Sequence, residues 1–192
     1  MKLAQVVLGL ACSLTACASS PDPIFYALSS RPGCALHSRK LTIEVRRPGL
    51  PSYLDRPYIV KRVTLERLAF EADERWGAPL QEMLGTTLAD DLSARLPDCA
   101  VYSEAGSISA TADAQVEVEL SRFELSGDGS IKLLAEVAVN WTATGTTPRI
   151  DRYALSARPG ASRTADVVSS MSLAVGQLAD VIAKAVLRGP SG

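Results

Sequence analysis

The thiol of Cys17 is the group in this chain most clearly placed for chemistry. It closes a leader in which one positive charge, Lys2, precedes an uncharged apolar run from Leu3 to Leu14. This layout is typical of the n-region and h-region of a secretory signal peptide, which end in small residues before a cleavage point. The leader therefore predicts that the chain is exported from the cytoplasm and cleaved before Cys17.

The residues Leu14-Thr15-Ala16-Cys17 are similar to the lipobox of bacterial lipoproteins, whose cysteine becomes the lipidated first residue of the mature chain. Cys12 fits this pattern less well, because Gly9 stands in the leucine position. An ordinary signal peptide or a transmembrane anchor is the alternative, although a spanning helix needs roughly 20 apolar residues. We expect a lipoprotein signal peptide over residues 1–16, lipidation of Cys17 and a short tether over residues 17–23.

Cys34 and Cys99 are the two cysteines that remain once Cys12 leaves with the leader and Cys17 carries lipid. An even pair in an oxidising compartment predicts a disulfide, which would contribute on the order of 4 kcal/mol by the chain-entropy model. Two free thiols are the alternative, because the pair must first reach disulfide geometry. A metal site is not expected, since His37 is the only histidine and there is no Cys-x-x-Cys spacing.

Catalytic constellations are missing from the sequence. A Ser-His-Asp or Cys-His arrangement would have to use His37, a lone histidine near Cys34. The acidic pairs Asp90-Asp91 and Glu117/Glu119 are interpreted as solvated charges, and no glycine loop of the phosphate-binding kind links a strand to a helix. We therefore expect no enzymatic activity, no cofactor and no metal, with a hydrolase of unrecognised type as the alternative.

Composition limits the class of partner. The formal net charge is −1, so there is no basic excess with which to hold nucleic acid. Hydrophobic residues make up 47% of the chain and aromatic residues only 5%, which describes an aliphatic globule and not a disordered chain. The length predicts a single domain, here placed at residues 24–188.

Alternation of apolar and polar residues predicts strands at residues 24–28, 41–45, 59–61 and 63–70. A helix is predicted from Pro79 to Leu96, because apolar side chains recur at steps of three and four and Pro97 ends the pattern. Asp90, Asp91 and Arg95 are expected on the opposite, solvent-facing side of this helix.

The second half of the chain predicts a β-meander followed by a helix. Residues 114–125 and 131–141 alternate about a Gly127-Asp128-Gly129 turn, with a bulge near Ser121 and Arg122, and a third strand follows at 150–157. An apolar stripe from Val168 to Ala185, with a cap at Ser162 or Thr164 and a stop at Gly189-Pro190, predicts the second helix. The fold class is therefore α+β, an antiparallel sheet with two amphipathic helices packed on one face as a two-layer sandwich. A contact of this stripe with another subunit, giving a homo-oligomer, is the alternative to core packing.

The segment from Gly49 to Arg62 is unlike ordinary scaffold. Its two internal prolines, Pro51 and Pro57, remove backbone donors, so its apolar groups are not expected to be buried as in a central strand. Exposed aromatic and apolar groups suit a partner surface or a lipid. We predict a partner-binding site at Tyr53, Leu54, Asp55, Arg56 and Pro57, with a structural loop that packs Tyr53 inward as the alternative.

Three stretches carry a family resemblance: Leu50 to Val60, Arg75-Trp76-Gly77-Ala78-Pro79-Leu80 at the start of a helix, and Phe25-Tyr26-Ala27-Leu28 after the lipobox. Together they resemble the ABC-type transport auxiliary lipoprotein family, over most of the chain from Cys17 to the last helix. Gly77 and Ala78 depart from the more polar pair that members often carry.

The resemblance implies a non-enzymatic, lipid-anchored protein that faces the periplasm. Its partners would be an ABC permease and ATPase and a substrate-binding protein of the mammalian-cell-entry type, in a system that moves lipids or other apolar molecules. The outer membrane is the expected location, because Ala18 and not aspartate follows Cys17. A small lipid-binding module or an envelope-assembly lipoprotein without a transporter partner is the alternative.

Overall fold

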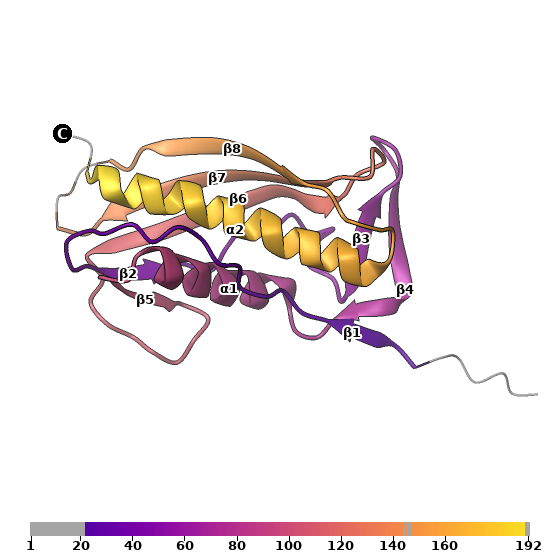
Figure 1. The fold of residues 1–192 in the computed structure, drawn as a ribbon, viewed down its shortest axis with the longest axis horizontal. Coiled ribbons are helices and arrows are strands. Elements are labelled where there is room, and N and C mark those ends of the chain that lie inside the picture. The colour runs from indigo at the N-terminus through magenta and orange to yellow at the C-terminus, as the bar shows by residue number, and fades with distance from the viewer. Residues whose placement is uncertain (1–21, 144, 146, 191–192) are drawn as a thin grey trace, which may run out of the picture.

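The computed structural model describes residues 22–143, 145 and 147–190, and its elements are drawn in Figure 1. The signal peptide, Cys17 and most of the tether lie outside the described residues. The elements, in chain order, are β1 (Ile24–Tyr26), β2 (Thr42–Val45), β3 (Tyr58–Arg62), β4 (Leu68–Trp76), α1 (Leu80–Arg95), β5 (Ala100–Ser103), β6 (Ala114–Leu125), β7 (Ile131–Trp141), β8 (Ile150–Ala157) and α2 (Thr164–Arg188).

The β6–β7–β8 meander is the longest part of the sheet. β6 and β7 pair antiparallel from Ala114 beside Trp141 to Leu125 beside Ile131, and β8 pairs antiparallel with β7. The register shifts between Leu120 and Arg122, where the change of phase predicts a bulge. The predicted hairpin, bulge and third strand are confirmed.

The other edge of β6 carries one long, interrupted strand. β2 pairs parallel with the start of β6, and Lys61 of β3 lies beside Leu125 at its end. Between them the chain still bonds to β6, because the amide of Gly49 donates to the carbonyl of Val118 (2.8 Å) and the carbonyl of Gly49 accepts from Leu120 (2.9 Å). Residues 50–57 therefore form a loop that leaves the sheet and returns to it.

The sheet is mixed, which corrects the predicted antiparallel sheet. The order is β1-β4-β3-β6-β2-β5, with β7 and β8 beyond the other edge of β6. β1 with β4, β2 with β5, and β2 and β3 with β6 are parallel pairs. Alternation along one strand identifies its faces but not the direction of its neighbour, so the pattern could not predict these pairings.

One strand is displaced from its predicted bounds, and another is not predicted at all. The amide of Val63 donates to the carbonyl of Arg67 (2.9 Å), which closes a turn where a strand is predicted, and β4 then runs to Trp76. β5 is absent from the predicted elements, because four residues after Pro97 are too few for an alternation pattern.

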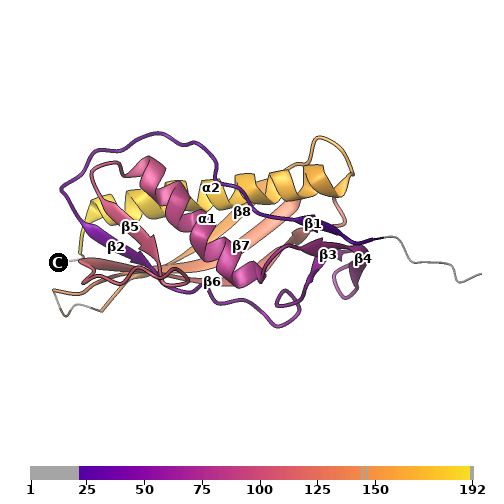
Figure 2. The ribbon, with the colours of Figure 1, turned by 90° about the horizontal axis from the view of Figure 1, so that it is seen from below.

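Both helices lie on the same side of the sheet, as Figure 2 shows. α2 packs against β6, β7 and β8, whereas α1 packs against β2, β5 and α2. By length and composition α2 could cross a membrane, but most of that window is buried within the protein. Its apolar stripe therefore serves the core, together with the inward rows of β6 and β7.

Arg95 and Asp91 are buried between the helices, and this corrects their predicted place on the solvent side of α1. Arg95 is 2% exposed. Its guanidinium contacts Asp180 of α2 (2.5 Å) and donates to the carbonyls of Arg31, Asp91 and Gly176, each at 3.0 Å. The apolar pattern missed this arrangement because α1 is covered on its second side by the chain between β1 and β2.

That covering chain, residues 27–40, is called the strap. Figure 1 shows it crossing in front of the helices. The Asp91 carboxylate accepts hydrogen bonds from the Ser30 hydroxyl (2.7 Å) and the Arg31 amide (2.6 Å), and the Leu36 amide donates to the Arg95 carbonyl (2.7 Å). The strap is thus fixed to α1 by polar contacts.

Candidate functional site

The loop of residues 50–57 is held near both ends by backbone hydrogen bonds in which a proline carbonyl is the acceptor. The carbonyl of Pro51 accepts from the Leu54 amide (2.9 Å), and the carbonyl of Pro57 accepts from the Trp76 amide of β4 (2.8 Å). Proline carries no N–H, so the loop cannot continue the ladder with β6. It therefore presents a short, turned segment at the side of the sheet.

Beneath the loop, Tyr53 is tied to a buried carboxylate. Its hydroxyl donates to Glu124 of β6 (2.8 Å), and the Arg62 guanidinium lies 5.6 Å from the centre of its ring. Arg62 and Arg122 each donate an Nε–H to the same Glu124 oxygen, at 2.9 and 2.8 Å. Glu124 follows Phe123, whose side chain is in the core, so the carboxylate points to the opposite face, where the loop lies.

The charges of this cluster stabilise one protonation state. Burial opposes ionisation of Glu124, but hydrogen bonds from Arg62, Arg122 and Tyr53 outweigh it and lower the pKa of the carboxyl. Burial and the bond to Glu124 raise the pKa of Tyr53 to about 12. At neutral pH the pair is therefore a neutral phenol that donates to an ionised carboxylate, which makes a strong support for the loop.

Leu54 is 1% exposed and belongs to the core, which corrects its prediction as a contact residue. The turn closed by Pro51 directs this side chain inward although the backbone is outside the ladder. Tyr53 is half-buried and its hydroxyl is bonded to Glu124, so only part of this side chain is accessible to a partner.

The outer side of the loop is formed by exposed Asp55, Arg56 and Pro57. The Arg56 guanidinium lies 6.0 Å from the ring centre of Phe70 on β4, and that ring is 44% exposed. Asp55, Arg56, Pro57 and Phe70 are here called the Arg56 surface. Phe70 could not be paired with Arg56 from sequence, because the contact depends on the register of β4 beside β3.

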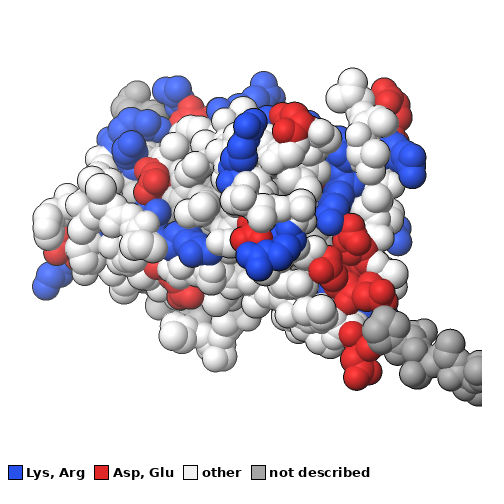
Figure 3. Space-filling model, turned by 45° about the vertical axis from the view of Figure 1, so that its right-hand side comes forward, with Lys and Arg blue, Asp and Glu red and all other residues white. Residues whose placement is uncertain are grey.

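More apolar side chains are exposed at the same end of the molecule. Phe25 on β1 and Leu65 in the β3–β4 turn are 61% and 79% exposed, and Ile24 and Val63 accompany them. Figure 3 shows acidic side chains gathered where the N-terminal chain leaves the body. Glu71, Asp73 and Glu74 on β4 supply acidic groups on this end. This end thus combines exposed apolar groups with charges of both signs.

Cys34 and Cys99 are both free thiols in the structure, so the predicted disulfide is not formed there. Cys34 is exposed on the strap. The Cys99 sulfur instead contacts the Ser38 hydroxyl (3.2 Å) and the Arg39 carbonyl (3.7 Å), four and five residues beyond Cys34. An even number of cysteines suggests a disulfide, but the count does not show whether the two thiols lie within bonding distance.

His37 is paired with a single carboxylate at the surface of the protein. Its Nδ1 contacts the Asp98 carboxylate at 3.0 Å on the surface, and this bond lowers the pKa of Asp98. Within residues 22–143, 145 and 147–190, no three His, Cys, Asp or Glu side chains are grouped so that they could hold a metal ion.

Comparison with known proteins decides the family. Residues 26–183 match the family of ABC-type transport auxiliary lipoprotein components. The chain belongs to this family. The match covers the strap, the loop of residues 50–57, the meander, α1 and most of α2, so it confirms the resemblance noted in the sequence. Membership makes the protein an envelope lipoprotein associated with an ABC transporter.

Two solved structures share the fold of this auxiliary lipoprotein. One is an uncharacterized protein with a TM-score of 0.72 and 17% identity, which covers 86% of this chain and 99% of its own. The other is protein XCC0632 from Xanthomonas campestris, of the DUF330 family, with a TM-score of 0.70 and 17% identity over 86% of this chain and 95% of its own. A comparison with curated proteins finds no match.

Proposed function

We propose that this lipoprotein is a non-enzymatic docking component that binds the mammalian-cell-entry type substrate-binding protein of its ABC transport system. In this role it aids the movement of lipids or other apolar molecules across the envelope. The observation that carries the proposal is the Arg56 surface, in which an exposed arginine on a supported loop lies 6.0 Å from the ring centre of exposed Phe70 on β4.

Binding energy in protein interfaces concentrates in aromatic and arginine residues that lose water on docking. Arg56 and Phe70 are such residues, and the Tyr53–Glu124 bond holds the loop before the partner arrives. Less ordering entropy is then lost on association. Asp55 beside Arg56 adds a charge of the opposite sign, which favours a partner of matched charge over a uniformly charged surface.

A lipid anchor at Cys17 would place this surface near a membrane. Cys17 and Ile24 are seven positions apart, and an extended chain spans at most about 3.3–3.6 Å per residue, so the reach is about 25 Å. The proposed location is the periplasmic side of the outer membrane. A Cys17→Ser variant should lose acyl labelling and membrane retention, and continued retention with label would contradict the anchor.

Co-purification from envelopes tests the docking role. The tagged full-length lipoprotein, solubilised in mild detergent, should retain the mammalian-cell-entry type protein together with the ABC permease and ATPase. An Arg56→Ala/Phe70→Ala variant should lose them. Arg152→Ala is a matched control, because Arg152 is exposed on β8 and pairs with Glu136 outside the Arg56 surface. If the wild type, Arg56→Ala/Phe70→Ala and Arg152→Ala recover equal amounts of the transport partners, the Arg56 surface is not the docking site.

A further inference from the structure

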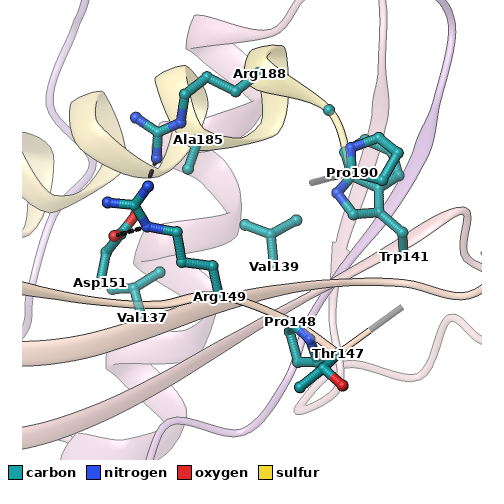
Figure 4. A pocket seen from close by; sticks show the side chains of 11 residues that line it. Val137, Val139, Trp141, Thr147, Pro148, Arg149, Asp151, Ala185, Arg188 and Pro190 are labelled. Atoms are coloured by element: carbon teal, nitrogen blue, oxygen red, sulfur yellow. Dashed lines mark hydrogen bonds and ion pairs between the residues drawn. The ribbon is translucent and has the colours of Figure 1, made fainter. Parts of the chain in front are cut away.

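The end of α2 leaves part of the inward row of β7 without a helix over it. Val137, Val139 and Trp141 continue the inward alternation of β7 to the end of the strand. α2 ends at Arg188, and Gly189 has a φ of 74°, which glycine adopts without steric cost. A cavity of about 140 Å³ lies between β7, β8 and this end of α2 (Figure 4). Its lining comprises Val137, Val139, Trp141, Thr147, Pro148, Arg149, Asp151, Ala185, Arg188, Gly189 and Pro190.

Two arginines and one carboxylate stand at the side of the cavity. The Arg149 Nε donates to Asp151 Oδ1 (2.6 Å), and an Arg188 Nη donates to Asp151 Oδ2 (3.0 Å). Figure 4 shows both guanidinium groups converging on Asp151, Arg149 from the residue before β8 and Arg188 from the end of α2. Two positive charges beside one negative charge leave a net charge of +1. Both arginine side chains are mostly exposed, and each guanidinium has five N–H donors, so donors remain for an anion.

We propose that this cavity binds a small amphiphilic carboxylate. The apolar part would contact Val137, Val139 and Ala185, and the carboxylate would accept hydrogen bonds from Arg149 and Arg188. An apolar cavity of about 150 Å³ takes one benzene molecule, so the apolar part is limited to about six carbons.

The cavity is separate from the proposed docking surface. The C-terminal end of α2 and the point where the N-terminal chain leaves the body are at opposite ends of the long axis in Figure 1. Ligand binding at the cavity and partner binding at the Arg56 surface can therefore succeed or fail independently.

Titration of the full-length protein with sodium hexanoate, followed by the NMR signals of Val139 and Trp141, tests the site. Hexan-1-ol is the neutral probe, and butanoate and decanoate give the dependence on length. The expected Kd for hexanoate is on the order of 1 mM for so small a ligand. The affinity for the carboxylates should rise by about fourfold per methylene until the apolar part has about six carbons, and then stay level.

Three variants separate the contributions. Arg188→Gln should weaken hexanoate binding about tenfold but change hexan-1-ol binding little, whereas Ala185→Met should fill the cavity and weaken both ligands about tenfold. Arg152→Gln is the control on β8, because its partner is Glu136 and it does not line the cavity. Hexanoate that does not saturate below about 50 mM, or that binds Ala185→Met as tightly as the wild type, would overturn the proposal.

Discussion

The hydroxyl of Tyr53 donates a 2.8 Å hydrogen bond to the fully buried carboxylate of Glu124, 71 positions away in the chain. This bond joins the proline-flanked loop to the central strand of the sheet. It assigns the residues of the loop to two roles, because Tyr53 and Leu54 support it from within while Asp55, Arg56 and Pro57 are presented to solvent.

Removal of the Tyr53 hydroxyl should lower stability without emptying the space under the loop. A hydrogen bond to a charged group contributes about 1.5–3 kcal/mol. Tyr53→Phe should therefore lower the free energy of unfolding by this amount, as measured by urea denaturation. Tyr102→Phe is the matched control, because its hydroxyl donates to a neutral carbonyl, that of Ala110, and should cost about 1 kcal/mol. Equal losses in the two variants would argue against the ionised Glu124 acceptor.

The contribution of Glu124 should depend on pH in the acid range. Its pKa in the folded protein is below the ordinary value of 4.5, so the stabilisation is fully present above that value and is lost as the pH falls through the folded-state pKa. Glu124→Gln should therefore be less stable than the wild type by about 3–5 kcal/mol at pH 7, with a smaller difference below about pH 4. Urea unfolding at a series of pH values measures this, and a difference that grows on acidification would have the wrong sign.

Arg95 should be among the most sensitive positions in the helices. Arg95→Ala removes the buried guanidinium that donates to Asp180 and to the carbonyls of Arg31, Asp91 and Gly176, so about 3–5 kcal/mol should be lost. Hydrogen exchange should also show faster exchange at the Leu36 amide, whose acceptor is the Arg95 carbonyl. Arg152→Ala should leave the thermal midpoint nearly unchanged, because that ion pair is exposed. A shift in Arg95→Ala as small as in Arg152→Ala would contradict the role of Arg95 in fixing the strap.

The two free thiols predict a simple outcome in alkylation. Cys34 is exposed and should react with iodoacetamide in the native, unreduced protein. Cys99 is partly buried beside Ser38 and should react more slowly. Mass spectrometry of protein from the periplasm counts the adducts. If both cysteines react only after reduction, even in denaturant, the disulfide forms in the cell and the structure describes the reduced form.

Sequence patterns located most of the elements because alternation and helical periodicity are local. The meander and both helices were predicted within a few residues, and the phase change at Phe123 located the bulge. The parallel pairs were not predicted, since no local signal relates residues 42–45 to residues 100–103 and 114–116. The burial of Asp91 and Arg95 was not predicted either. Polar residues on a helix are buried only when another segment supplies their hydrogen-bond partners, and the helix pattern alone does not reveal that segment.

The candidate site was predicted in part. The prolines indicated correctly that residues 50–57 leave the ladder, and Arg56 and Pro57 are exposed. The inward direction of Leu54, the buried Glu124 and the neighbour Phe70 all depend on the register of β3 with β4 and β6, which neither spacing nor composition specifies.

The central claim is that the Arg56 surface binds the transport partner, and calorimetric titration of the full-length lipoprotein with the purified mammalian-cell-entry type protein tests it most directly. Truncation at an interface hot spot costs about 2 kcal/mol or more, so Arg56→Ala and Phe70→Ala should each raise the Kd at least about thirtyfold. Arg152→Ala should bind as the wild type does, and all four proteins should keep nearly the same thermal midpoint. An unchanged Kd in both Arg56→Ala and Phe70→Ala, with folding intact, would contradict the account.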